Sequence, residues 1–160
     1  MENAEQPRFE ELGPLRLAGL GESYNDSTST NIPALWQRFE PHIGKISGQV
    51  GTVTYGAVYP ETQQGNFVYV CAVEVSDFSH LPVDFKQLSL SRQKYAVFDH
   101  AGYLSTLRDT WSHIFTKWLP SSGFKIAASP RLERYTANFN ASKHGGLEIW
   151  IPITEKSPAH

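Results

Sequence analysis

Glu133 and Tyr135 are the residues whose types and spacing most clearly suggest a chemistry. They lie in the stretch Pro130–Tyr135, whose alternation of side chains predicts a strand. Residues two apart on a strand point to the same face, so a carboxylate and a phenol would lie side by side. If that face is enclosed, Glu133 is a fixed negative charge beside aromatic rings, which suits flat organic cations. The alternative is a solvated Glu133 paired with a neighbouring arginine.

Glu148 and Trp150 are predicted to extend this face. The stretch Leu147–Ile153 places its isoleucines on one side, which is expected to pack against a helix. Glu148 and Trp150 then face the other side, the same side as Glu133 and Tyr135 if the two strands pair. A register slip of one residue would exchange Trp150 for Ile149.

Further aromatic side chains could complete the walls of such a pocket. For each of them, packing in the hydrophobic core is the more common explanation of an aromatic residue at helical or strand spacing. The candidates are Trp36, Tyr55, Tyr69, Phe98 and Trp111.

The order of predicted elements is strand-helix-strand-strand, repeated twice. It predicts an α+β fold with pseudo-twofold symmetry, antiparallel sheets, helices on one side and a ligand cleft between the halves. The second helix would be capped by Ser105 and has an apolar stripe that includes Leu104 and Trp111. The predicted strands are residues 15–24, 52–59, 67–75, 94–103, 131–139 and 147–153. The first helix would be capped by Thr30 or Asn31 and has an apolar stripe between residues 32 and 43, and Pro41 ends or kinks it.

A chain of 160 residues is expected to form one domain. We predict a flexible N-terminus at residues 1–10 and a single ligand-binding domain at residues 11–155. Its halves would be residues 11–76 and 92–155, joined by a polar, loop-like segment at 76–91. The apolar positions between residues 81 and 90 could form either a lid or a dimer contact.

Composition argues against several classes of function. With 14 basic and 16 acidic residues, the chain lacks the basic surplus that direct nucleic-acid binding requires. The sequence contains no run of 18 apolar residues, so it predicts no membrane-spanning helix. Cys71 is the single cysteine, which excludes an intramolecular disulfide, fits a reducing compartment and makes a cytoplasmic location the expectation.

The sequence predicts no metal and no cofactor. Its six histidines are scattered without the spacing of a metal site. Cys71 lies in an apolar strand with no histidine near it in sequence, which disfavours a thiol nucleophile. No nucleophile elbow, phosphate loop or dinucleotide fingerprint occurs.

Five stretches resemble the GyrI-like small-molecule-binding domain, the effector-binding module of bacterial multidrug regulators of the AraC and MerR classes. Together they extend over most of the chain, from about residue 10 to 155. They are Asn31–Phe39, Lys94–Phe98, Trp118–Gly123, and Leu132–Tyr135 together with Glu148–Pro152.

This resemblance implies two strand-helix-strand-strand units around a cleft, with a central glutamate that meets lipophilic cations. Glu133 occupies the position of that glutamate. In such regulators the module is joined to a helix-turn-helix domain, whereas about ten residues precede the first predicted strand here. The sequence is therefore similar to stand-alone members of the family, including those on mobile gene cassettes.

Three functions are consistent with the resemblance. The leading hypothesis is a sensor or sequestering protein for cationic, aromatic, lipophilic small molecules. The second is a hydrolase of strained electrophilic toxins, with Glu133 as general base and Tyr135 or Trp150 holding the substrate. The third is a protein-interaction module of the gyrase-inhibitor type, with a protein partner or a homodimer.

Overall fold

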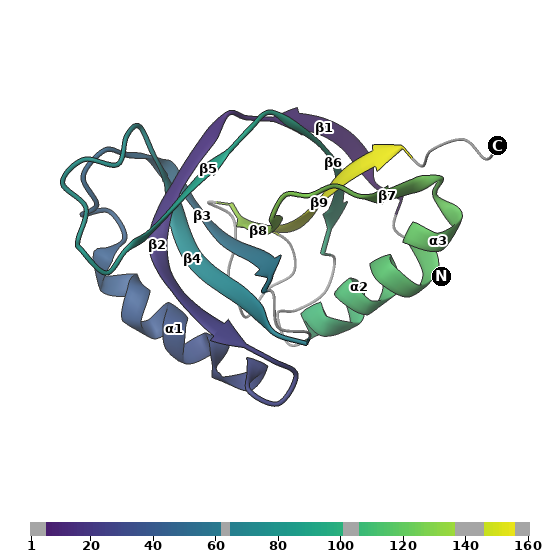
Figure 1. Cartoon of the computed structure of the whole chain (residues 1–160), viewed down its shortest axis with the longest axis horizontal. Coiled ribbons are helices and arrows are strands. Elements are labelled where there is room, and N and C mark those ends of the chain that lie inside the picture. The colour runs from purple at the N-terminus through teal and green to yellow at the C-terminus, as the bar shows by residue number, and fades with distance from the viewer. Residues whose placement is uncertain (1–5, 62–64, 101–105, 137–145, 156–160) are drawn as a thin grey trace.

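Alternating hydrophobic side chains build most of this chain into one curled antiparallel sheet (Figure 1). The computed structural model describes residues 6–61, 65–100, 106–136 and 146–155. Within these residues the sheet runs in the order β1-β6-β9-β8-β3-β4-β2-β5, and β7 pairs with β9. The strands are β1 (Arg8–Leu12), β2 (Leu15–Tyr24), β3 (Gln49–Pro60), β4 (Phe67–Val75), β5 (Lys86–Leu90), β6 (Gln93–Asp99), β7 (Phe124–Ile126), β8 (Arg131–Tyr135) and β9 (Leu147–Glu155).

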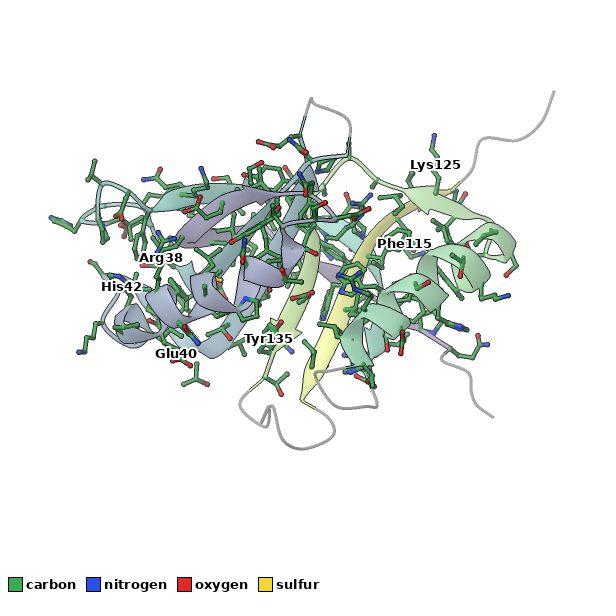
Figure 2. All side chains as sticks on the ribbon, turned by 90° about the horizontal axis from the view of Figure 1, so that it is seen from below. Arg38, Glu40, His42, Phe115, Lys125 and Tyr135 are labelled. Atoms are coloured by element: carbon green, nitrogen blue, oxygen red, sulfur yellow. The ribbon has the colours of Figure 1, made fainter. Side chains whose placement is uncertain are left out.

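Two helical segments lie on the same side of the sheet, as Figure 2 shows from below. The first is α1 (Ile32–Phe39), which lies between the 3₁₀ turns η1 (Ser29–Asn31) and η2 (Glu40–His42). The second runs through α2 (Leu107–His113), the π-helical turn η4 (Ile114–Trp118) and α3 (Leu119–Ser121). No helix among the described residues is long and apolar enough to cross a membrane.

The two halves of the sheet have matching arrangements on either side of the β3–β8 pair. Outward from this pair, one half has the order β3, β4, β2, β5 and the other has the order β8, β9, β6, β1. The helix α1 follows β2 and α2 follows β6, so each half is strand-helix-strand-strand. The α+β fold with two antiparallel repeats and helices on one side is thereby confirmed.

The central strands are buried on both faces, as the apolar run of β4 predicts. Val70 and Ala72 pack into the core on the face away from the helices, with Leu132. Cys71 and Val73 point the other way, into the core beneath α1. A third core lies beneath α2 and is built largely from the isoleucines of β9.

The prediction missed β1, β5 and β7. Arg8–Leu12 is a strand rather than part of a frayed terminus, and Lys86–Leu90 is a strand within the segment predicted as a loop. Both β1 and β5 are edge strands with several charged or polar side chains, so no continuous apolar pattern marks them. Residues 1–5, the predicted helix start at Leu104 and Ser105, and the predicted strand beyond residue 136 lie outside the described residues.

Replacing Leu132 by Ala should lower the free energy of unfolding by about 2–5 kcal/mol, because it removes a large buried side chain from the centre of the sheet. Leu132 is completely buried, whereas Val83 is fully exposed. Val83→Ala is therefore a suitable control and should change the unfolding free energy by less than about 0.5 kcal/mol. Urea denaturation of both variants measures the difference, and equal losses would contradict a close-packed centre.

Candidate functional site

A cavity of about 740 Å³ lies between the two helical segments, over the region where β3 meets β8. We call it the central pocket. In Figure 2, Tyr135 lies at the α1 side of this region and Phe115 at the α2 side. It is lined by Asp26, Ser29, Ile32, Pro33, Trp36, Gln37, Glu40, Ile43, Thr54, Val58, Phe67, Tyr69, Leu107, Arg108, Trp111, Phe115, Arg131, Glu133 and Tyr135.

Glu133 lies in the central pocket with its carboxylate held by three neutral donors. The hydroxyl groups of Tyr69 and Tyr135 donate to Oε1 at 2.6 and 2.7 Å. The indole Nε1 of Trp111 donates to Oε2 at 3.0 Å. Glu133 is only 6% exposed, so these bonds replace most of the water that a carboxylate would otherwise hold.

Burial has the largest effect on the pKa of the Glu133 carboxyl group. It raises the pKa of Glu133 above the ordinary value of 4.5, and the hydrogen bonds from Tyr69, Tyr135 and Trp111 offset part of that rise. Burial and the nearby Glu133 charge raise the pKa of Tyr69 and of Tyr135 well above 10, so both phenols remain neutral donors. The result is one ionisable acid surrounded by neutral aromatic donors.

Trp36 extends this network from α1. Its indole Nε1 donates to the hydroxyl of Tyr69 at 3.0 Å, which orients that hydroxyl toward Glu133. Its ring also meets Tyr135 edge to face, with centroids 5.2 Å apart. On the opposite side Trp111 stacks on Phe115 at 5.9 Å, one helical turn away. Both helical segments thus supply aromatic walls to the central pocket.

The structure brings together five of the nine predicted site residues and separates the other four. Glu133, Tyr135, Trp36, Tyr69 and Trp111 all line the central pocket. The other four do not line it. Tyr55 and Trp150 belong to the core on the opposite face of the sheet, and Phe98 packs beneath α2. Glu148 also lies outside the pocket.

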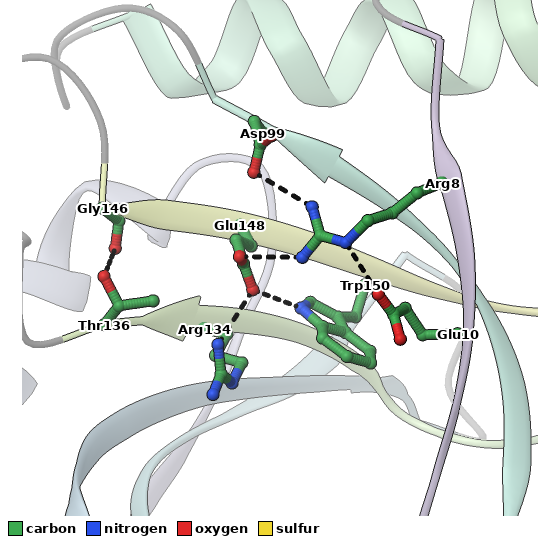
Figure 3. A network of polar contacts seen from close by, with 8 residues as sticks. All are labelled: Arg8, Glu10, Asp99, Arg134, Thr136, Gly146, Glu148 and Trp150. Carbon is green, nitrogen blue, oxygen red and sulfur yellow. Dashed lines mark hydrogen bonds and ion pairs between the residues drawn. The ribbon is translucent and has the colours of Figure 1, made fainter.

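Glu148 belongs to a polar network around β9 that Figure 3 shows. Its carboxylate accepts hydrogen bonds from Arg8 at 2.9 Å, Arg134 at 3.1 Å and the indole of Trp150 at 2.9 Å. These partners lower the pKa of Glu148 despite its partial burial, in contrast to Glu133. The network joins the edge strand β1 to the centre of the sheet, which suits a structural role.

The predicted side for Glu148 and Trp150 is wrong, because the strand register opposes it. Glu133 pairs with Ile149, while Leu132 pairs with Trp150. Paired residues on neighbouring strands point to the same face, so Ile149 shares the face of Glu133 and Trp150 shares the face of Leu132. The fold thus adopts the register in which Ile149, rather than Trp150, shares the face of Glu133.

Sequence reasoning missed Gly56 and did not assign Arg131 to the site. Gly56 pairs with Glu133 across the β3–β8 boundary. A Cβ atom at Gly56 would lie 2.2 Å from the Tyr69 hydroxyl oxygen and 2.9 Å from Oε1 of Glu133. A glycine in a strand can signal such a close approach. Arg131 shares the strand face of Glu133 and lines the central pocket.

The described residues contain no group of three or more His, Cys, Asp or Glu side chains that could hold a metal ion. Cys71 is buried in the core beneath α1. Burial raises the pKa of the Cys71 thiol far above its ordinary value, which makes it a poor nucleophile at neutral pH.

This chain is similar in sequence to one protein family and to a known transcriptional regulator. The family model of the GyrI-like small molecule binding domain matches residues 5–154. The transcriptional regulator BrlR of Pseudomonas aeruginosa is 27% identical over 152 residues, which are 93% of this chain and 53% of BrlR. This chain thus spans about half the length of that regulator.

Solved structures with the same fold include SAV2435 bound to tetraphenylphosphonium, with a TM-score of 0.73 and 20% identity over 93% of this chain and 94% of that one. Another is the integron cassette protein VCH_CASS2 from the mobile metagenome of Vibrio cholerae. Its TM-score is 0.70, with 17% identity over 93% of this chain and 96% of that one. At these identities the likeness concerns the fold.

Gly56→Ala should displace the Tyr69 ring from Glu133 and destabilise the protein by about 1–3 kcal/mol, the usual effect of overpacking. Gly21→Ala is a comparison on another strand with a lesser clash, because its Cβ would lie 2.7 Å from the flexible end of Lys86 and 2.9 Å from Cγ2 of the buried Val70, and it should have a smaller effect. Urea denaturation gives the stability of each variant, and intrinsic tryptophan fluorescence, to which the pocket residues Trp36 and Trp111 contribute, reports the change in the pocket. An unchanged spectrum and stability in Gly56→Ala would contradict this close approach.

Proposed function

Because the chain belongs to the GyrI-like small-molecule-binding domain family, we propose that the central pocket binds cationic, aromatic, lipophilic small molecules. The protein would act as a sensor of such compounds or would sequester them. Glu133 supplies the negative charge, and the aromatic side chains around it supply faces for a flat or multi-ring cation. The residues proposed to contact the ligand are Glu133, Tyr135, Trp36, Tyr69 and Trp111.

The observation that carries this proposal is a buried carboxylate whose hydrogen-bond donors are all neutral. Tyr69, Tyr135 and Trp111 solvate Glu133 without neutralising it. Among the described residues, no Lys or Arg forms an ion pair with it. An ionised carboxylate removed from water carries a penalty of several kcal/mol, which a cationic ligand would relieve.

The size and lining of the central pocket support the same class of ligand. Its volume of about 740 Å³ falls in the range of sites for drug-sized molecules. Each cation–π contact contributes about 0.5–2 kcal/mol, so a few contacts together with apolar burial approach the roughly 8 kcal/mol of a micromolar complex. An anionic ligand would be repelled by the ionised Glu133.

The relatives support both parts of the proposal. SAV2435 has been solved with tetraphenylphosphonium, an aromatic cation, in a domain of the same fold. BrlR is a transcriptional regulator about half of which corresponds to this chain, which supports a sensing role. The compound that this protein meets in its cell would then share the charge and aromatic character of that cation.

Hydrolysis of strained electrophilic compounds is a second candidate, because burial raises the pKa of Glu133. A general base at neutral pH benefits from such a rise. Its carboxylate already accepts three hydrogen bonds, which makes simple binding the stronger proposal. Mass spectrometry of a candidate epoxide or aziridine after incubation distinguishes the two, since only hydrolysis adds water to the compound.

Glu133→Gln should weaken the binding of tetraphenylphosphonium by at least about tenfold, because the substitution removes the charge that the cation neutralises. The matched control is Glu148→Gln, which removes a carboxylate from outside the central pocket and should leave affinity within about threefold. Isothermal titration calorimetry measures both, and a neutral and an anionic aromatic analogue should bind weakly to all three proteins. Equal affinity of the wild type and Glu133→Gln would contradict the proposal.

Affinity for tetraphenylphosphonium should rise with pH, because the ligand keeps its charge while Glu133 loses a proton. Below the ordinary carboxyl pKa of 4.5 the group is neutral and binding is weak, and affinity increases as the pH passes through the raised pKa. The unliganded protein has the opposite trend. Its folded state holds this proton more tightly than the unfolded chain, so the contribution of Glu133 to stability falls over the same pH interval.

Titrations from pH 4 to 8, the range over which carboxyl groups with raised pKa ionise, measure this dependence. Glu133→Gln provides the control and should show weak affinity that changes little with pH. A wild-type profile as flat as that of the variant would mean that another group sets the charge of the site.

A further inference from the structure

Arg131 places a second charge, a half-buried guanidinium group, in the central pocket. It lies on β8 two residues before Glu133, and both side chains line the cavity. Two residues along a strand are about 7 Å apart at their Cα atoms and point to the same face, so the positive and the negative side chain line the cavity side by side. They are the charged side chains that the strands contribute to the pocket, whereas Asp26, Glu40 and Arg108 line it from exposed positions outside the sheet.

The guanidinium group of Arg131 is positioned by an aromatic ring. Its Cζ lies 5.3 Å from the ring centroid of Phe115, so the planar group is supported on the α2 side of the pocket. The Nε atom is buried and has no hydrogen-bond acceptor among the described residues.

Nearby charges do not supply the missing acceptor. Among the described residues no carboxylate forms an ion pair with Arg131. The other arginine at the pocket, Arg108, is exposed and differs from Arg131 in having a partner, because it donates to the Ser29 hydroxyl at 3.2 Å. Burial lowers the pKa of Arg131, as expected for a guanidinium without a neighbouring anion.

We infer that Arg131 binds a carboxylate on the ligand, so that the central pocket selects aromatic cations that also carry an acidic group. A guanidinium can donate two parallel hydrogen bonds to a carboxylate, here from its two terminal nitrogens, since the Nε atom is closed off from the pocket. The cationic ring system would meanwhile lie over Glu133 between Trp36 and Trp111. This inference rests on the proposed binding of cations and adds the chemistry of a second group to it.

Two rhodamine dyes that differ only at one carboxyl group provide the test. Rhodamine 110 has a free carboxylate, and rhodamine 123 is its methyl ester, so both present the same cationic ring system. Arg131→Met retains the apolar stem over Phe115 and removes the donors. It should weaken rhodamine 110 binding by about tenfold or more and leave rhodamine 123 within about threefold. Arg131→Lys should recover part of the loss, because it restores charge without the planar pair of donors.

Fluorescence anisotropy measures each affinity, and thermal unfolding confirms that the variants are folded. If Arg131→Met weakens both dyes equally, or neither, Arg131 only supports the wall and the inference is overturned. If the wild type binds rhodamine 123 in a Glu133-dependent way while rhodamine 110 ignores Arg131, the cation site stands and this inference alone fails. If the wild type binds neither dye, both proposals fail.

Discussion

The carboxylate of Glu133 lies almost entirely out of water, and much of the surrounding structure serves to hold it there. Two phenols and an indole donate to it from β4, β8 and α2. Trp36 of α1 holds one of those phenols in turn. Because these donors are neutral, they make the buried charge tolerable without cancelling it, and the group remains available to an incoming cation.

The twofold arrangement of the sheet explains why such a site can exist. The halves meet at β3 and β8, where Gly56 faces Glu133 directly. A helical segment from each half covers the same face, and the space between the segments remains open as the central pocket. The glycine leaves room for Tyr69 to reach the carboxylate across the junction. A repeated fold thus leaves a cavity at its centre, where both halves contribute side chains.

The strand β8 carries side chains for ligand binding on one face and side chains that support the fold on the other. On the pocket face of β8, Arg131 and Glu133 are the charged groups available to a ligand. On the opposite side Leu132 fills the core, while Arg134 joins Glu148 in the network that secures β1 to the sheet. The alternation of a strand allows binding chemistry and structural support to occupy neighbouring residues with little interference.

The sequence by itself determined the order of the main elements, the two-sided burial of β4 and the shared face of Glu133 and Tyr135, because these follow from local periodicity. It did not reveal the edge strands β1 and β5, whose polar composition hides their pattern. Only the tertiary structure decided that Trp150 lies away from Glu133, and that Tyr69 and Gly56 meet its carboxylate. Those facts depend on register and on pairing between distant strands, and the period of a single strand cannot specify which face of its neighbour it will share.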